Sequence, residues 1–191
     1  MSSSIFRRAT FAVALLSLVL IMPFAARAQV TIEVHGGVGY TAVDVDGWSQ
    51  GTAVNWDQFA VPVYAQLFAL QVGAAQLGLE VGYDYFFYYE VRIPDPFFTV
   101  IRGRDVEATR VHAVARLPVG GRAFVEAGAG PYFFDGFTNL GATLAVGLPI
   151  GLTPRLALPI KLRTGLVLDE DASLVPLSLS VGLSYRAGGL R

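Results

Sequence analysis

The chain has 191 residues, of which 53% are hydrophobic and only 15% are charged, with a formal net charge of −1. The absence of cysteine excludes disulfides and thiolate metal sites, and the near-neutral charge without any basic run gives no support for nucleic-acid binding. Soluble domains usually carry about 25% charged residues, so this chain is unusually apolar for a protein surrounded by water.

The N-terminal segment has the features of a secretory signal peptide. Arg7 and Arg8 precede an apolar run over residues 9–22, and an Ala-Arg-Ala sequence ends at Ala28. A basic start, a short apolar core and a small-residue cleavage site are typical of such peptides. The alternative is a membrane anchor, but the run is shorter than the roughly 20 residues that a helical span needs. We therefore expect a signal peptide over residues 1–28, removed after Ala28, and one domain over residues 29–191.

Along the rest of the chain, large apolar residues alternate with small or polar ones in eight segments. A period of two predicts β-strands with two different faces. The turns predicted at 72–76, 118–122 and 151–155 are short and rich in glycine or proline. The connections at 44–58 and 92–105 are predicted as longer loops, and those at 135–139 and 169–173 as short ones. The predicted strands cover residues 30–43, 59–71, 77–91, 106–117, 123–134, 140–150, 156–168 and 174–186.

The stretch 77–91, with the sequence LGLEVGYDYFFYYEV, shows the two faces most clearly. Its odd positions are bulky and apolar or aromatic, and the positions between them are mostly glycine or acidic. Glycines with balanced charges are a poor water-facing surface, whereas a charge facing lipid costs about 2–4 kcal/mol at the midplane for Arg or Lys. The pattern therefore predicts an all-β fold, an eight-stranded antiparallel up-and-down transmembrane β-barrel with its charges inside.

The inward face is predicted to hold an ionic network that fills the lumen. In an antiparallel hairpin, paired residue numbers have a constant sum, and closing the 92–105 loop with Val91 opposite Asp105 places Glu80 opposite Arg116. The next hairpin then places Arg116 opposite Glu126, which gives a row of one arginine between two carboxylates. Both histidines are expected to be hydrogen-bonded lumen residues. The predicted network comprises Glu33, Glu80, Asp84, Arg110, His112, Arg116, Glu126, Lys161 and Arg163.

Two predicted loops carry residues that bear on binding. The first, DVDGWSQG (44–51), resembles a calcium loop only faintly, because the later ligands are missing, and we expect a polar surface loop there. The second, PFFTVIRGR (96–104), has an apolar tip followed by two arginines that suit phosphate groups. It predicts a contact with lipopolysaccharide or a protein partner; the alternatives are that the two strands continue above the membrane or that the tip folds over the barrel mouth. The candidate contact residues are Phe97, Phe98, Arg102 and Arg104.

The signal peptide, the eight alternating segments and the last strand LSLSVGLSYR (177–186) make the chain resemble small bacterial outer-membrane β-barrels of the OmpA/OmpX type. The resemblance implies a monomer in the bacterial outer membrane, in contact with its lipid and with lipopolysaccharide as a further candidate. It also implies insertion by the barrel-assembly machinery, which reads an alternating last strand ending in an aromatic residue, here Tyr185. The chain departs from the family pattern in the five residues from Ala187 to Arg191, which follow that aromatic residue.

Three functions remain open at this level. The first is a structural or interaction role in envelope integrity, adhesion or lipid contact, which suits a barrel whose interior is just wide enough for its own side chains. The second is a narrow transport channel for ions or small apolar solutes, and the third is a soluble periplasmic lipocalin-like barrel. No H-x-S pair or nucleophile elbow involves the serines of the last predicted strand (Ser178, Ser180 and Ser184) or the two histidines, so we expect no enzyme, cofactor, metal site or nucleic-acid partner.

Overall fold

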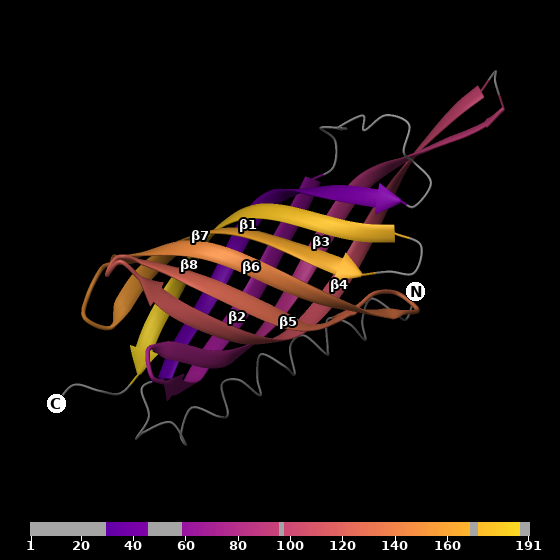
Figure 1. Ribbon diagram of the computed structural model, residues 1–191. Helices are drawn as coiled ribbons and strands as arrows, with labels where there is room; N and C mark the ends of the chain where they lie inside the picture. The colour runs from indigo at the N-terminus through magenta and orange to yellow at the C-terminus, as the bar shows by residue number, and fades with distance from the viewer. Residues whose placement is uncertain (1–29, 46–58, 96–97, 169–171, 188–191) are drawn as a thin grey trace.

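Eight antiparallel strands form hydrogen bonds in chain order and close into a barrel in the computed structural model of the protein (Figure 1). The structure describes the backbone of residues 30–45, 59–95, 98–168 and 172–187. The predicted signal peptide and the loop at 44–58 therefore lie largely outside the described residues. The strands are β1 (Val30–Val45), β2 (Phe59–Val72), β3 (Ala75–Asp95), β4 (Phe98–Val119), β5 (Ala123–Phe133), β6 (Thr138–Gly151), β7 (Leu156–Leu168) and β8 (Ala172–Ala187).

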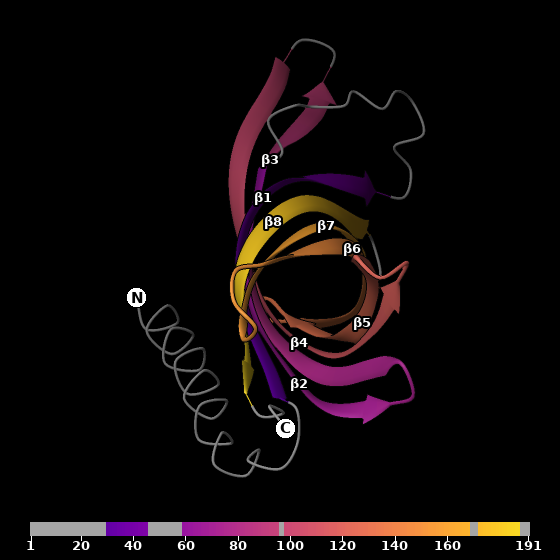
Figure 2. The same cartoon turned by 90° about the vertical axis from the view of Figure 1, so that its left-hand side faces the viewer.

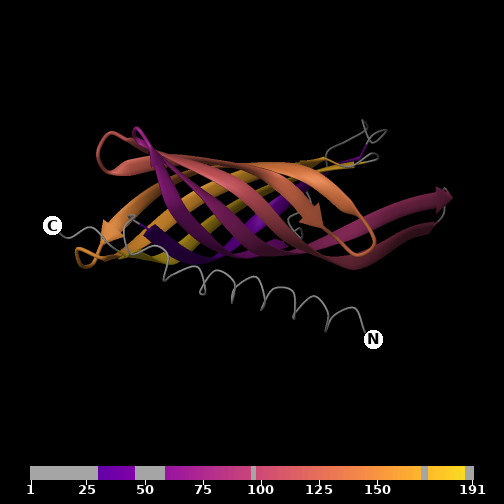
Figure 3. The same cartoon turned by 90° about the horizontal axis from the view of Figure 1, so that it is seen from below.

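The barrel closes where the first strand meets the last. β1 pairs with β8 along their whole length, from Val30 opposite Ala187 to Val45 opposite Ala172. Figure 2 shows the strands as a closed ring, and Figure 3 shows them running obliquely along the barrel. Closure removes the open sheet edges that an isolated sheet would expose. The predicted eight-stranded up-and-down topology is therefore confirmed, and most strand ends agree within a few residues.

The hairpin of β3 and β4 differs from the prediction because most of the predicted loop at 92–105 is strand. β3 continues to Asp95 and β4 begins at Phe98. Proline, glycine and arginine in this stretch favour a loop. The two strands nevertheless pair continuously from Arg92 opposite Val100 to Gln76 opposite Arg116. β2 begins opposite Phe87, so the last part of this hairpin extends past its neighbours as a two-stranded ribbon (Figure 1).

Tight turns occupy the end of the barrel where β1 begins and β8 ends. Gly73, Gly120 and Gly121 have φ values of 60°, 59° and 77° in the turns β2–β3 and β4–β5. Residues with a Cβ rarely adopt this left-handed backbone, which explains the glycines in the predicted turns at 72–76 and 118–122. The projecting β3–β4 ribbon lies at the opposite end, so the two ends of the barrel are distinct.

The two faces of the wall have opposite polarity. Large apolar side chains are exposed on the outside, for example Leu140 at 68%, Leu162 at 55% and Leu179 at 52%. Four outward positions, Val30, Ala65, Leu67 and Val81, are buried. The inward positions carry most of the buried polar and charged residues of the described chain. The alternation read from the sequence therefore assigns the faces of the strands as observed.

Candidate functional site

The described lumen contains a charge-balanced set of buried ionic side chains. All nine residues of the predicted network point inward and are at most 8% exposed. Because an isolated charge in a packed interior is strongly unfavourable, the partners of each group decide what the site can do. The set comprises four acids, Glu33, Glu80, Asp84 and Glu126, and four bases, Arg110, Arg116, Lys161 and Arg163, besides His112.

One cluster forms around Arg116, which lies between two carboxylates. Its Nη1 and Nη2 donate to the two oxygens of Glu33 at 2.7 and 2.6 Å. Its Nε and Nη2 donate to Oε2 of Glu126 at 3.1 and 2.9 Å. Lys161 Nζ lies 3.1 Å from Oε2 of each of these carboxylates. We call these four residues, which come from β1, β4, β5 and β7, the Arg116 cluster.

Two aromatic rings pack against the Arg116 guanidinium. Its Cζ lies 4.1 Å from the ring centre of Phe68 and 4.2 Å from that of Phe124. A cation over an aromatic face is attracted by the ring quadrupole, more strongly where water is excluded. Arginine is suited to this position because its planar group can stack on rings and form bidentate bonds with carboxylates at the same time.

A second cluster forms around Glu80, which is fully buried. Arg163 donates to both of its oxygens, at 2.8 Å from Nη1 and 2.6 Å from Nη2. Arg110 donates through Nε to Glu80 Oε1 at 2.7 Å and through Nη1 to Asp84. Arg163 Nη2 also donates to the Thr143 hydroxyl at 3.0 Å. Glu80, Asp84, Arg110 and Arg163 are called the Glu80 cluster below.

Gln66 on β2 joins the two clusters. Its Nε2 donates to Glu80 Oε2 at 2.7 Å and also to Glu126. Its Oε1 accepts from Lys161 Nζ at 2.5 Å and from Arg116 Nη2 at 3.4 Å. Sequence reasoning missed this residue because it is uncharged. The alternation of the 59–71 segment contains the signal, since Gln66 falls on the face opposite the outward valines.

The predicted row of Glu80, Arg116 and Glu126 is wrong in one of its two pairings. Arg116 does lie opposite Glu126 in β4–β5. In β3–β4, however, Glu80 lies opposite His112, and Gln76 lies opposite Arg116. The hairpin closes nearer its tip than predicted, because residues 92–105 are mostly strand. Glu80 therefore pairs with Arg110 and Arg163, and the second carboxylate beside Arg116 is Glu33.

The two histidines differ in their surroundings. His35 Nε2 lies 3.0 Å from Glu33 Oε2, and its ring stacks on Tyr64 with the centroids 4.7 Å apart. His112 packs edge-on against Tyr132, and its Nδ1 lies 3.9 Å from Glu80 Oε1. Within the described chain neither ring nitrogen of His112 has a hydrogen-bond partner. The expected hydrogen-bonded role therefore holds for His35 and is wrong for His112.

Inward glycines leave space for the large side chains of the lumen. Both charged and aromatic side chains occupy this space. A Cβ on Gly82 would lie 2.6 Å from Arg110 Cζ, and a Cβ on Gly182 would lie 2.6 Å from His35 Cε1. At Gly147 the colliding group is the ring of Phe124. A side chain at these positions would displace a buried group.

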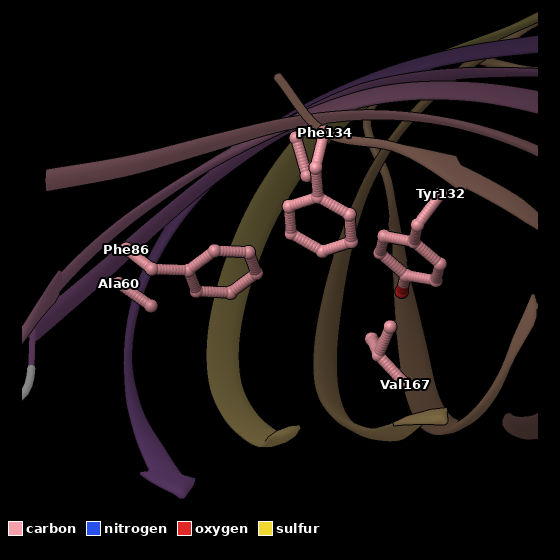
Figure 4. Close-up of a cluster of buried hydrophobic side chains, with 6 residues drawn as sticks. Ala60, Phe86, Tyr132, Phe134 and Val167 are labelled. Atoms are coloured by element: carbon pink, nitrogen blue, oxygen red, sulfur yellow. The ribbon is translucent and has the colours of Figure 1, made fainter. Parts of the chain in front are cut away.

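An apolar cluster covers the Glu80 cluster at the end where the β3–β4 ribbon projects. Figure 4 shows Phe86, Phe134 and Tyr132 turned toward the same space. Between this cluster and the charged groups is a pocket of about 20 Å³, and about 10–15 Å³ suffices for one water. The cluster consists of Ala60, Phe86, Ala108, Tyr132, Phe134 and Val167.

The candidate contact residues lie only in part within the described chain. Phe97 lies outside it, and Phe98, Arg102 and Arg104 belong to β4, with backbone described and side chains outside the description. By register, Arg102 lies opposite Glu90 and Arg104 opposite Tyr88. The expected continuation of the two strands is thus observed for the backbone, and the contact with a partner stays a prediction.

The chain is a closed barrel of eight antiparallel strands with an ionic interior and an apolar exterior. No protein-family profile and no curated protein sequence matches the chain. Within the described residues there is no helix long and apolar enough to cross a membrane.

Solved structures of small outer-membrane barrels match the chain at the level of the fold. Ail, the attachment invasion locus protein of Yersinia pestis, is 12% identical with a TM-score of 0.47, over 83% of this chain and 99% of that one. Neisserial surface protein A is 12% identical with a TM-score of 0.48, over 80% and 96%. The outer membrane protein OprG from Pseudomonas aeruginosa is 10% identical with a TM-score of 0.47, over 86% and 99%. The eight-stranded closed architecture that the resemblance implied is given by the strand order of the chain itself.

Proposed function

We propose that the protein is an integral barrel of the bacterial outer membrane with a structural or interaction role in envelope integrity, adhesion or lipid contact. The observation that carries this proposal is the inverted polarity of the wall. Leucine and valine side chains about half exposed cover the outside, while the charged groups are buried inside. This distribution suits a barrel surrounded by lipid and filled by its own polar side chains.

The polarity argues against a soluble lipocalin-like barrel. Such a barrel encloses an apolar ligand cavity and turns polar residues toward water. Here Glu80, Lys161 and Arg110 are at most 2% exposed inside the wall. In water, the exposed leucines and valines would form an apolar surface far larger than the few hundred Å² that soluble monomers usually tolerate.

The filled lumen favours a structural role over transport. The Arg116 and Glu80 clusters are linked by Gln66 into one hydrogen-bonded group that spans the interior. An ion would have to break several of these buried pairs to pass. A narrow channel for ions or small apolar solutes is the alternative and predicts conductance. The proposed role is non-enzymatic, and the buried Ser180 is already hydrogen-bonded to the Tyr64 hydroxyl at 2.8 Å.

The β3–β4 ribbon is the proposed interaction end. Its strands pair with each other beyond the last β2 and β5 partners, at Phe87 and Thr109. We propose that this ribbon faces the cell exterior, because the opposite end has the short turns that outer-membrane barrels place in the periplasm. Its proposed contacts are lipopolysaccharide or a protein, through Phe97, Phe98, Arg102 and Arg104.

The remaining predictions from the sequence, on oligomeric state, export and membrane insertion, are part of the same proposal. The chain is proposed to be a monomer, to lose residues 1–28 on export, and to be inserted by the barrel-assembly machinery. Tyr185 is the proposed aromatic residue of the insertion signal, and it lies on the outer face at 41% exposure. Fusing a longer polar tail after Arg191 and measuring membrane insertion tests whether this machinery tolerates residues beyond the aromatic one.

Cell fractionation combined with gel migration of unheated and boiled samples tests the membrane assignment. We expect the protein in the outer-membrane fraction and a shift in migration on boiling, because closed barrels resist detergent until heated. Recovery in the soluble periplasm without a heat shift would overturn the assignment. Planar-bilayer recording separates the two functions, since sustained openings of the pure protein favour the channel and their absence favours the structural role.

A further inference from the structure

Two arginines lie side by side at the end of the barrel that has the tight turns. Arg155 is the last residue of the β6–β7 connection, and Arg186 lies at the end of β8. The backbone amide of Arg186 donates to the carbonyl of Arg155 at 2.9 Å. Both side chains are exposed, and neither has a hydrogen-bond or ion-pair partner among the described residues. Because like charges on neighbouring strands repel each other, the pair is unfavourable without an anion.

The exposed charges at this end of the described chain are all positive. Arg122, in the β4–β5 turn, is a third exposed arginine here. The exposed acids whose side chains are described, Glu107 and Asp135, lie toward the opposite end, in the ribbon half of β4 and just after β5. The turn end therefore attracts anionic groups, and the other end does not share this excess of positive charge.

The arginine pair lies at the edge of the apolar band that covers the wall. Leu156, which follows Arg155, pairs with Tyr185, which precedes Arg186. Tyr185 and the turn residue Leu152 are exposed apolar groups beside the pair. Tyrosine at the margin of an apolar band is typical of the membrane–water interface, at the level of the lipid headgroups. Arginine side chains next to it are long enough to extend to that level.

The β6–β7 turn holds the backbone of Arg155 in place. The Thr153 hydroxyl accepts from the backbone amides of Arg155 and Leu156 at 3.2 and 3.0 Å. The amides of Leu152 and Thr153 donate to the Leu156 carbonyl at 2.9 and 3.1 Å. A backbone that is already ordered reduces the entropy cost of binding a ligand.

We propose that Arg155 and Arg186 together bind the phosphate of an anionic phospholipid in the leaflet beside the turns. Planar guanidinium groups suit phosphate oxygens because each can donate two parallel hydrogen bonds. A lipid is favoured over a soluble anion because Leu152 and Leu156 place apolar groups beside the charges. The inference rests on the proposed membrane location, and the proposed orientation makes this leaflet the periplasmic one.

Nuclear magnetic resonance of the barrel in lipid nanodiscs tests the proposal. The discs contain phosphatidylcholine with an increasing fraction of phosphatidylglycerol, and the arginine Nε–H signals are followed. We expect saturable shifts for Arg155 and Arg186, and smaller shifts without saturation for Arg122. Shifts that are absent, or equal for all three arginines, would overturn the proposal, since the latter indicates only a general surface potential.

Single substitutions that remove the same charge from the same end separate the pair from general electrostatics. Arg155→Gln should weaken the response of the Arg186 signal to phosphatidylglycerol about fivefold, the contribution of one basic residue near an anionic surface. Arg122→Gln is the matched control and should leave that response unchanged. Both positions are exposed, so neither substitution disturbs the packed lumen. Equal effects of the two substitutions would contradict the proposed pair.

Inorganic phosphate added to discs of pure phosphatidylcholine, with chloride at equal ionic strength as the control, tests for a soluble ligand. Saturable shifts of both arginines with phosphate alone would assign the pair to a free anion and overturn the lipid. The proposed membrane location is judged separately, by insertion into the discs. A barrel that inserts but does not respond to phosphatidylglycerol counts against the arginine pair alone, whereas a chain that does not insert counts against both proposals.

Discussion

Replacing Arg116 with leucine is the most direct test of the view that the lumen network stabilises the barrel. Arg116 is 8% exposed and donates to Glu33 and Glu126 at 2.6–3.1 Å. Removing one partner of a buried ionic pair costs about 3–5 kcal/mol, because the remaining charge stays buried without compensation. Here two carboxylates would be left with Lys161 as the only base in their cluster, so we expect a loss in the upper part of this range.

The assay is urea unfolding in detergent, followed by circular dichroism and by heat-modifiable gel migration. With an m-value of about 2 kcal/mol/M, a loss of about 4 kcal/mol lowers the urea midpoint by about 2 M. Arg122→Leu, at an exposed turn residue, is the matched control and should not change the midpoint measurably. Leu117→Ala, on the outer face beside Arg116, should have a smaller effect than Arg116→Leu.

The reasoning is refuted if Arg116→Leu unfolds at the same urea concentration as Arg122→Leu. That outcome would mean that leucine packs between Phe68 and Phe124 well enough to replace the ionic pairs. Some buried ion pairs in other proteins can indeed be replaced by apolar groups, but this requires replacing both partners. A double substitution of Arg116 and Glu126 by apolar residues would then test that explanation, because it removes both partners of one ionic pair.

Three further predictions concern the same lumen. Gly82→Ala should destabilise by about 1–3 kcal/mol, because the added Cβ would lie 2.6 Å from Arg110 Cζ, whereas Gly36→Ala, which has nothing within 4 Å, should be nearly neutral; equal urea midpoints would contradict this. Gln66→Leu should cost about 1–3 kcal/mol in the same assay, since it removes the amide that links the two clusters, and an unchanged midpoint would mean that the clusters are independent. Raising sodium chloride from about 0.1 M to about 1 M should change the unfolding free energy little, because buried pairs are poorly screened; a steep salt dependence would indicate a hydrated lumen.

The sequence was sufficient for the strands and their faces because both depend on a local period of two. An error in the predicted register moves residues to the wrong face only if the register shifts by an odd number of residues. The predicted β3–β4 pairing placed Glu80 opposite Arg116, four residues from its observed partner His112. An even shift preserves the face of every residue, so Glu80 and Arg116 were assigned to the lumen correctly although their partners were not.

The partners across the lumen could not be predicted from hairpin geometry. Glu33 on β1 meets Arg116 on β4, and Glu80 on β3 meets Arg163 on β7, and neither pair comes from adjacent strands. Such contacts depend on the width and tilt of the closed barrel and on side-chain lengths. The neutral members were missed for a different reason. Gln66 carries no charge, so only its place in the alternation marked it.

The strands differ in the sign of the charge that they bring to the lumen. Among the buried charges of the described chain, β1, β3 and β5 contribute only carboxylates, and β4 and β7 contribute only bases. None of these five strands is therefore electrically neutral on its inward face. The same holds for the pair β1–β2, which contributes Glu33 without a base.

This segregation has a consequence for biogenesis. A strand entering the hydrocarbon alone would carry unpaired charges into it, at a cost of about 2–4 kcal/mol for each arginine or lysine at the midplane. Without β7, the four carboxylates share only the two arginines of β4, and Lys161 and Arg163 on β7 supply the two remaining positive charges. We expect translocation to be all-or-none, with the strands assembled into a nearly closed sheet before the chain leaves the aqueous side.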